Sequence, residues 1–308
     1  MRWAAAPGQP PAPRYVHPPP PPQAKKGGGC FRVVLALGAL SFFFCCCILS
    51  VVAESAKDPL DWNSVVQNAP DVGGPRTNLG NALVPDDLPA SDARHYAWKN
   101  RFLTFELGYG LSSDVHDEIE DNFQDLSRTW SYKPGEGTSF TWIPPEACRN
   151  REWACVFDSV TRDNGEYVKA LTALFKARRD AEGLDARATT ELVVTFVQNI
   201  KYRLPTEETA AFGLLPPAIV VSDGSGDCDS KALLATVILN QLGVDAVVLL
   251  ASGLGHAALG VNVPTAYRKF GKKYSFVEVT TPGWPIGKVP PDYDIAGAWK
   301  VIPVAVQR

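Results

Sequence analysis

Apolar and polar positions follow helical or strand periods along most of the chain after residue 95. Residues 102–107 alternate in part and predict a strand, whereas apolar residues spaced three or four apart predict helices. These helices are expected over 114–127, 163–182 and 188–202. Pro205 then ends the helical pattern, and a more strongly apolar C-terminal segment follows.

The C-terminal segment has the clearest pattern. A long apolar helix is predicted over 229–242, with Gly243 as its stop. Strands are predicted over 244–250, 256–263 and 273–280, separated by turns or loops. Residues that could take part in a reaction are therefore expected either at the start of this helix or on these strands.

The first 95 residues have a different character. Proline runs within residues 1–29 predict a disordered, proline-rich cytoplasmic tail, with a ligand for a proline-reading domain as the alternative. From Val33 to Ala53 the chain has 21 residues without a charge, and one transmembrane helix is predicted over 31–53. Basic residues precede this run and acidic residues follow it, so the chain after Ala53 is expected outside the cytoplasm.

A cleaved signal peptide is the alternative to this anchor. Its apolar region usually spans about 7 to 15 residues and begins earlier in a chain. The sequence therefore predicts a single-pass membrane protein whose folded domain is periplasmic or at the cell surface. The cluster Cys45–Cys47 in the apolar run is either acylated or apolar filler. Residues 54–95, with scattered prolines and glycines, are predicted to form a linker or stalk.

Charge and cysteine content narrow the set of partners. The 30 basic and 33 acidic residues give a formal net charge of −3, which provides no broad basic surface for nucleic acid. Outside the apolar run and its flank, only Cys148, Cys155 and Cys228 remain of the seven cysteines. A Cys148–Cys155 disulfide is expected in an oxidising compartment, with two unpaired thiols as the alternative. A zinc site lacks further Cys or His ligands nearby, so no metal and no organic cofactor is expected.

Cys228 stands where a glycine-rich turn gives way to the predicted helix. A helix N-terminus stabilises a thiolate, and its unpaired N–H groups can stabilise the oxyanion that forms when a thiolate attacks a carbonyl. The alternating acids around it resemble the start of a calcium loop, but Cys228 occupies the position that needs glycine. Glycine and lysine spacing does not fit a P-loop either. Cys228 is therefore a candidate nucleophile, with a structural thiol as the alternative.

A histidine and an acid follow on two of the predicted strands. If these strands form a hairpin centred near Tyr267, His256 lies opposite Glu278, within reach of a side-chain hydrogen bond. The carboxylate then holds one imidazole nitrogen and leaves the other toward Cys228, as in thiol catalysis. A structural histidine and a solvent-facing glutamate are the alternatives. Small residues on the same strand face are expected to leave room for an approaching group: Ala258 and Gly260.

Five segments resemble the transglutaminase-like superfamily: 196–202 (FVQNIKY), 226–231 (GDCDSK), 255–258 (GHAA), 274–280 (YSFVEVT) and 282–287 (PGWPIG). The resemblance implies a papain-like α+β core in which a nucleophile-bearing helix packs on an antiparallel sheet. It implies Cys228 as nucleophile, His256 as base and Glu278 as the third member, where the family more often has aspartate. Gln198 is expected on the helix surface, with a second oxyanion donor as the alternative.

The resemblance also implies a thiol enzyme that acts on amide bonds of a protein or peptide substrate through a thioester. Hydrolysis by a peptidase or deamidase is expected rather than cross-linking, because alanines follow His256 where cross-linking members tend to have an aromatic residue. The alternatives are a non-catalytic binding or scaffold module at the cell envelope, and an anchor whose useful part is the proline-rich tail. Residues 188–308 are expected to form the core, and residues 96–187 an accessory α+β region or lid.

Overall fold

The computed structural model describes residues 75–83, 93–134, 140–204, 211–267, 269–295 and 297–305. These residues belong to one of two compact units, which contains Gly74–Arg308. The predicted tail (1–29) and the predicted transmembrane helix (31–53) lie outside the described residues. Within the described ranges, no helix combines the length and the apolar character needed to cross a membrane.

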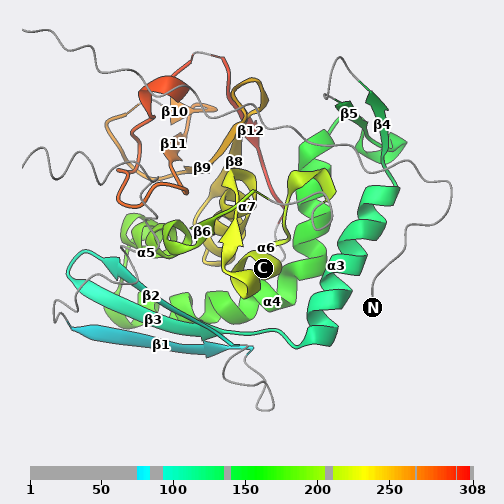
Figure 1. The fold of residues 1–308 in the computed structure, drawn as a ribbon. Coiled ribbons are helices and arrows are strands. Elements are labelled where there is room, and N and C mark those ends of the chain that lie inside the picture. Colours follow the sequence, from blue (N-terminus) through cyan, green and yellow to red (C-terminus); the bar gives the residue numbers. More distant parts are fainter. Residues whose placement is uncertain are drawn as a thin grey trace, which may run out of the picture. The chain divides into compact units, whose positions relative to one another are not determined.

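The described residues form a mixed α+β fold, which confirms the predicted class (Figure 1). Their five α-helices are α3 (Ser113–Arg128), α4 (Glu152–Glu182), α5 (Ala186–Asn199), α6 (Pro217–Asp223) and α7 (Cys228–Gln241). A five-stranded antiparallel sheet has the order β10 (Lys269–Phe270), β11 (Tyr274–Val277), β9 (His256–Val261), β8 (Ala246–Ala251), β12 (Lys300–Ile302). α7 packs on β8 and β9, and α4 and α5 pack on α7.

α7 is surrounded by other elements. The side chain of Asp227 caps its N-terminus and accepts a hydrogen bond from the Ser230 N–H at 3.2 Å. Beyond this cap the helix is apolar on nearly all sides, and it contacts α4, α5, α6 and two strands. A helix without a polar face has to be buried all round. The first residue of α7 is therefore fixed by buried neighbours.

The five-stranded sheet carries apolar side chains on both faces. Along β9, the odd-numbered positions 257–261 join the core that contains α7. Ala258 instead joins a second cluster with Phe270 and Phe276, against which Trp299 packs. Because side chains alternate along a strand, His256 shares the face of Ala258. His256 therefore begins β9 on the face that carries the second cluster.

A separate three-stranded sheet has the order β1 (Arg76–Ala82), β3 (Leu103–Tyr109), β2 (Arg94–Asn100). β2 pairs with β3 in antiparallel orientation, whereas β1 pairs with β3 in parallel. β1 falls within 54–95, so the prediction of a linker is wrong for these residues. Their sequence RTNLGNA lacks a strand pattern, and the pairing with β3 together with packing against α4 orders them.

Smaller elements connect these layers. Two two-stranded sheets are formed by β4 (Ser131–Pro134) with β5 (Phe140–Ile143) and by β6 (Lys201–Tyr202) with β7 (Ser225–Gly226). Four short 3-10 helices are η1 (Glu146–Cys148), η2 (Ala211–Gly213), η3 (Ser252–Leu254) and η4 (Pro291–Tyr293).

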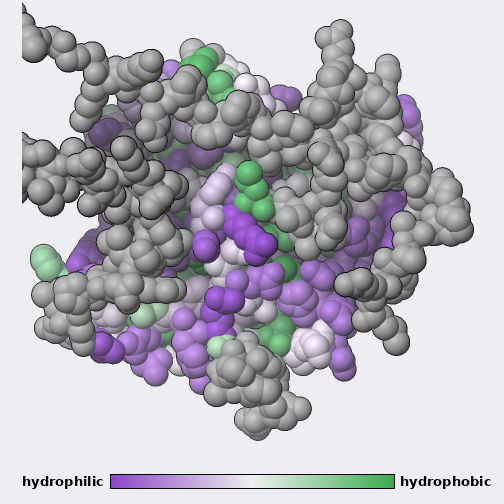
Figure 2. Space-filling view, in the orientation of Figure 1, coloured by the Kyte–Doolittle hydropathy of each residue, from purple (hydrophilic) through white to green (hydrophobic). Residues whose placement is uncertain are grey.

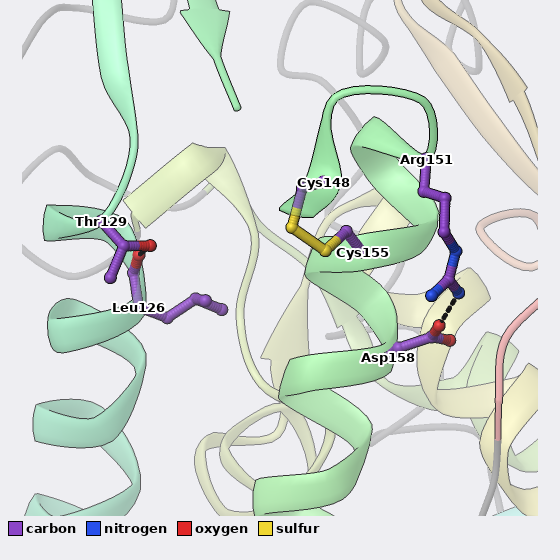
Figure 3. The surroundings of a disulfide bond; sticks show 6 residues. All are labelled: Leu126, Thr129, Cys148, Arg151, Cys155 and Asp158. Atoms are coloured by element: carbon purple, nitrogen blue, oxygen red, sulfur yellow. Dashed lines mark hydrogen bonds and ion pairs between the residues drawn. A yellow bond between two sulfur atoms is a disulfide. The ribbon is translucent and has the colours of Figure 1, made fainter. Parts of the chain in front are cut away.

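The predicted disulfide between Cys148 and Cys155 is confirmed. It joins η1 to the first turns of α4, as Figure 3 shows. In the same turns, Arg151 forms an ion pair with Asp158. The start of α4 is therefore held by a covalent bond and by an ion pair.

The helices predicted over 114–127 and 188–202 correspond to α3 and α5, but α4 begins at Glu152, well before the predicted start at 163. One hydrophobic core contains residues from both sides of the predicted boundary between 96–187 and 188–308. Large exposed apolar residues are scattered, and the coloured surface in Figure 2 is mainly hydrophilic. The accessory and core regions thus share one interior.

Candidate active site

Cys228 is the first residue of α7 and is 5% exposed. The chain reaches it through Gly224, whose φ of 64° lies in the left-handed region that glycine tolerates and that ends α6. β7 follows and pairs with β6 in parallel, at the end of α5. Two short elements therefore fix the approach to the cysteine.

The Cys228 thiol is neutral at rest. Burial raises its pKa well above the ordinary value, and the carboxyls of Asp229 and Asp227 raise it further. A hydrogen bond from the backbone N–H of Ala257 lowers the pKa but does not reverse the direction. This contact also brings the thiol beside the residue that follows His256. A base must therefore take the proton before the sulfur can attack a carbonyl.

Two carboxyls lie beside the thiol. Oδ2 of Asp227 is buried and has no ordinary hydrogen-bond donor among the described residues. Burial and the neighbouring Asp227 raise the pKa of Asp229 well above its usual range, and the two carboxyls contact each other. A raised pKa favours the protonated form of Asp229, and a protonated carboxyl can donate a hydrogen bond where an ionised one cannot.

His256 and Glu278 are in direct contact, with 2.9 Å between Nε2 and Oε2. Both side chains are buried. The contact was predicted, but the predicted register was wrong by two positions. Val277 pairs with Leu259, so Glu278 lies just beyond the end of β11 rather than opposite His256. A shift of two positions keeps both residues on one face, and the long glutamate side chain reaches the diagonal neighbour.

The carboxylate of Glu278 is held at both oxygens. Oε1 accepts hydrogen bonds from the N–H and the hydroxyl of Thr280. Burial raises the pKa of Glu278, but the hydrogen bonds from His256 and Thr280 lower it more, so the net pKa lies below its ordinary value. An ionised carboxylate only accepts hydrogen bonds, so Nε2 of His256 carries the proton. Nδ1 of His256 is then the basic nitrogen.

Aromatic rings confine the imidazole. Tyr293 stacks on His256 with 4.2 Å between ring centroids, and Trp299 meets it edge-on at 6.0 Å. The expectation that Gly260 leaves room for an approaching group is wrong. A Cβ at this position would lie 2.8 Å from a methyl group of Val247, so β8 already fills the space. The space beside Gly260 is therefore closed.

Two tyrosines interact electrostatically with Cys228, and one of them is the half-exposed Tyr202. Burial raises the pKa of its phenol, and the next contribution comes from Cys228. The pKa of Tyr293 is also raised, most by burial, next by the charge of Glu278 and then by the charge of Cys228. Of these two tyrosines, Tyr202 is the more exposed, at 49%.

The sequence did not predict the contacts that two further polar residues of the site make. Gln198, predicted on the helix surface, is 5% exposed and is bonded to the backbone at Glu278 and Gly283. Lys231, in the apolar helix, is fully buried and donates to the carbonyl of Ile200. A lysine inside an otherwise apolar helical run was the one signal that pointed to an internal polar contact.

Two further groups of polar residues do not include Cys228, His256 or Glu278. A cavity of about 300 Å³ is lined by Arg149, Asn150, Arg151, Glu152, Trp153, Lys300 and Ile302. Its arginines are already paired with carboxylates. The ligand atoms of His116, Asp117 and Glu120 lie within 4.8 Å of one another, but His116 is bonded to Asp223. Exposed acids commonly gather in this way without a metal.

No protein-family model matches the chain, and no curated protein and no solved structure matches it. The function proposed for it therefore depends on the geometry of its own side chains.

Proposed function

We propose that the protein is a membrane-anchored thiol enzyme that acts on amide bonds through Cys228, His256 and Glu278. The buried hydrogen bond between His256 and Glu278, beside a cysteine at a helix N-terminus, carries this proposal. A catalytic histidine needs an ionised carboxylate that holds its imidazole in one tautomer. The finer fold assignment, a papain- or transglutaminase-like core, is proposed on the same arrangement of helix and antiparallel strands.

The first half-reaction forms a thioester. Nδ1 of His256 accepts the proton of the Cys228 thiol while the sulfur attacks the substrate carbonyl. The unpaired N–H groups at the start of α7 stabilise the oxyanion. The C–N bond then breaks, and the imidazolium gives its proton to the departing amine. Glu278 remains ionised and stabilises the imidazolium by a charge-assisted hydrogen bond.

The second half-reaction releases the acyl group. His256 takes a proton from water, the hydroxide oxygen attacks the thioester, and the carbon–sulfur bond breaks. The proton returns to the sulfur, which restores the thiol and leaves a carboxylic acid. We propose hydrolysis in preference to amine transfer because water is abundant and no described group selects an amine. The substrate is then a protein or peptide, and the reaction is that of a peptidase or deamidase.

A non-catalytic binding module is the second candidate. One observation favours it: Cys228 is 5% exposed and the pKa of its thiol is raised by burial and by two neighbouring acids. An inert structural thiol has these properties as well. The difference lies in whether His256 can remove the proton when a substrate carbonyl is present.

The full-length protein and its Cys228→Ala variant provide the test. Both are incubated with casein and a fluorescent primary amine, and peptide release, deamidation and amine incorporation are read by mass spectrometry. Activity in the first protein and none in the second supports the thiol enzyme, and the product distinguishes hydrolase from transferase. Equal inactivity together with an unreactive Cys228 supports the binding module.

A further inference from the structure

The C-terminal end of α5 contacts both parts of the candidate active site. Gln198 belongs to the last turn of α5, and Ile200 is its C-cap residue. Gln198 reaches the turn after β11, which carries Glu278. Ile200 reaches α7, which begins with Cys228. One helix end therefore touches the elements that carry the thiol and the acid.

Gln198 closes the turn that carries the acid. Its side-chain amide donates to the carbonyl of Glu278 at 2.8 Å, and its Oε1 accepts from the N–H of Gly283 at 3.2 Å. The residue is 5% exposed, so both bonds are shielded from water and are costly to leave unmade. Any movement of this turn moves the carboxylate that orients His256.

Lys231 makes the corresponding contact from α7, the helix that begins with Cys228. It follows Cys228 by three positions, so the two residues lie on the same face of α7. Its ammonium donates to the carbonyl of Ile200 at 2.7 Å. The end of a helix leaves carbonyls without intrahelical donors and carries partial negative charge. Lys231 satisfies one of these carbonyls on α5.

A fully buried ammonium is costly for the fold. Burial lowers the pKa of Lys231 to about 8, while the charges of Glu278, Asp227 and Cys228 act in the opposite direction. Among the residues that the structure describes, Lys231 is the one lysine or arginine in the buried class. An apolar side chain of similar volume fills such a site at lower cost. The acidic groups of the site explain why a cation is kept there.

We propose that Gln198 and Lys231 are positioning residues that hold the Glu278 turn and the Cys228 helix against the same end of α5. Gln198 keeps Glu278 within reach of His256. Lys231 sets the start of α7 and places one positive charge near the thiolate that forms during attack. The inference rests on the proposed function, because it assigns these residues to the same active site.

The test compares three variants of the full-length protein with the wild type. Lys231→Met and Gln198→Met remove the polar atoms at similar side-chain volume. Gln241→Met is the matched control, because Gln241 at the other end of α7 also bridges two groups. It accepts from Thr172 at 2.7 Å and donates to the carbonyl of Gly165 at 3.4 Å. Melting temperature, turnover of casein and the pH dependence of Cys228 alkylation by iodoacetamide are measured, the last by mass spectrometry of the Cys228 peptide.

Lys231→Met is expected to slow Cys228 alkylation at about pH 7 by roughly tenfold, because a nearby positive charge is lost. The difference from the wild type is expected to disappear above about pH 8, where Lys231 itself loses its charge. Gln198→Met is expected to lower kcat about tenfold at unchanged KM, and to slow alkylation at about pH 7 by a similar factor. Gln241→Met is expected to lower the melting temperature without changing kcat or the alkylation profile.

If Gln198→Met and Lys231→Met lower only the melting temperature, as Gln241→Met does, the positioning roles are overturned. If the wild-type protein shows no turnover and an unreactive Cys228, the proposed function fails. If it shows no turnover but Cys228 reacts, the alkylation profiles alone decide the inference. Shifted profiles in both variants support it, and profiles identical to that of the wild type overturn it.

Discussion

At the scale of single residues, Glu278 determines the chemistry of His256. One carboxylate oxygen contacts the imidazole and the other accepts two hydrogen bonds from Thr280. The carboxylate therefore cannot rotate away, and the imidazole has one tautomer and one ring orientation. Tyr293 stacks on the same ring and limits its movement. In the proposed mechanism, the basic nitrogen is thus fixed before a substrate arrives, which would lower the cost of reaching the reactive geometry.

Replacing Glu278 with glutamine is expected to lower kcat by roughly 10²- to 10⁴-fold. The amide can donate to Nε2 of His256 and so stabilises the tautomer whose Nδ1 carries the proton. Casein turnover measures the effect. Glu166→Gln, which changes an exposed glutamate on α4, is the control and is expected to leave kcat unchanged. A Glu278→Gln variant with wild-type kcat would remove Glu278 from the mechanism.

The same substitution has a pH-dependent effect on stability. The pKa of Glu278 lies below its ordinary value because its hydrogen bonds outweigh burial. A lowered carboxyl pKa stabilises the folded state above the unfolded-state pKa, and this stabilisation is lost as the pH falls through the folded-state pKa. The free energy of unfolding of the wild type is therefore expected to exceed that of Glu278→Gln at about pH 7, and the gap is expected to close below about pH 4. Urea unfolding across this range measures it, and a gap that persists unchanged in acid would contradict it.

At the scale of elements, local signals were predictable from the sequence. The start of α7 follows from a capping aspartate, Asp227, before an apolar run. The pairing of β9 with β11 was predictable in kind but not in register. The connection between them contains β10, which pairs with the far edge of β11, so it is not a simple hairpin loop. The predicted contact between His256 and Glu278 still forms, because a register error of two positions leaves both side chains on the same face of the sheet.

Contacts between distant segments were not predictable. β1 has a polar sequence, and its order comes from a parallel partner and from α4. In the sequence, Gln198 looks like a surface residue and Lys231 like an interruption of an apolar run. Their roles become visible only when α5 packs against α7 and against the turn after β11. Tertiary contacts override local propensity at such positions. A single sequence therefore predicts the candidate triad more readily than the residues that hold it.

Removal of β1 is expected to destabilise the domain. A chain that begins at Ala93 loses the parallel partner of β3 and the buried side chain of Ala82, whereas a chain that begins at Gly74 keeps both. The expected loss in the free energy of unfolding is about 2 to 4 kcal/mol, measured by urea unfolding of both chains. Equal stability of the two chains would mean that β1 contributes nothing to the fold.

The Cys148–Cys155 disulfide is expected to stabilise the start of α4. It closes a short loop with a sequence separation of 7 residues, and the chain-entropy model gives about 2 to 3 kcal/mol for a loop of this size. The double variant Cys148→Ala, Cys155→Ala is expected to lose this amount in guanidinium unfolding. Alkylation of Cys228 serves as the control and is expected to stay unchanged. A changed alkylation rate would show that this turn is coupled to the thiol.

At the scale of the whole molecule, one core joins the regions before and after residue 187. α4 packs on β1, α6 and α7, and α5 packs on β2 and α7, so the helices link the two larger sheets. Cys228, at the start of α7, lies within the helix that the other helices surround. Damage to either sheet is therefore expected to reach the interior that fixes the candidate site, although the three candidate side chains come from the C-terminal part.

The disulfide and the uncharged run from Val33 to Ala53 point to the same location for the domain. Structural disulfides persist in oxidising compartments, and 21 uncharged residues are enough to span a bilayer. The full-length protein is therefore expected to stay with the membrane fraction after an alkaline wash, with Cys148 and Cys155 oxidised when thiols are trapped in acid at lysis. A chain that begins at Glu54 is expected in the aqueous fraction. Recovery of the full-length protein in the aqueous fraction would remove the anchor, and free thiols at both positions would place the domain in a reducing compartment.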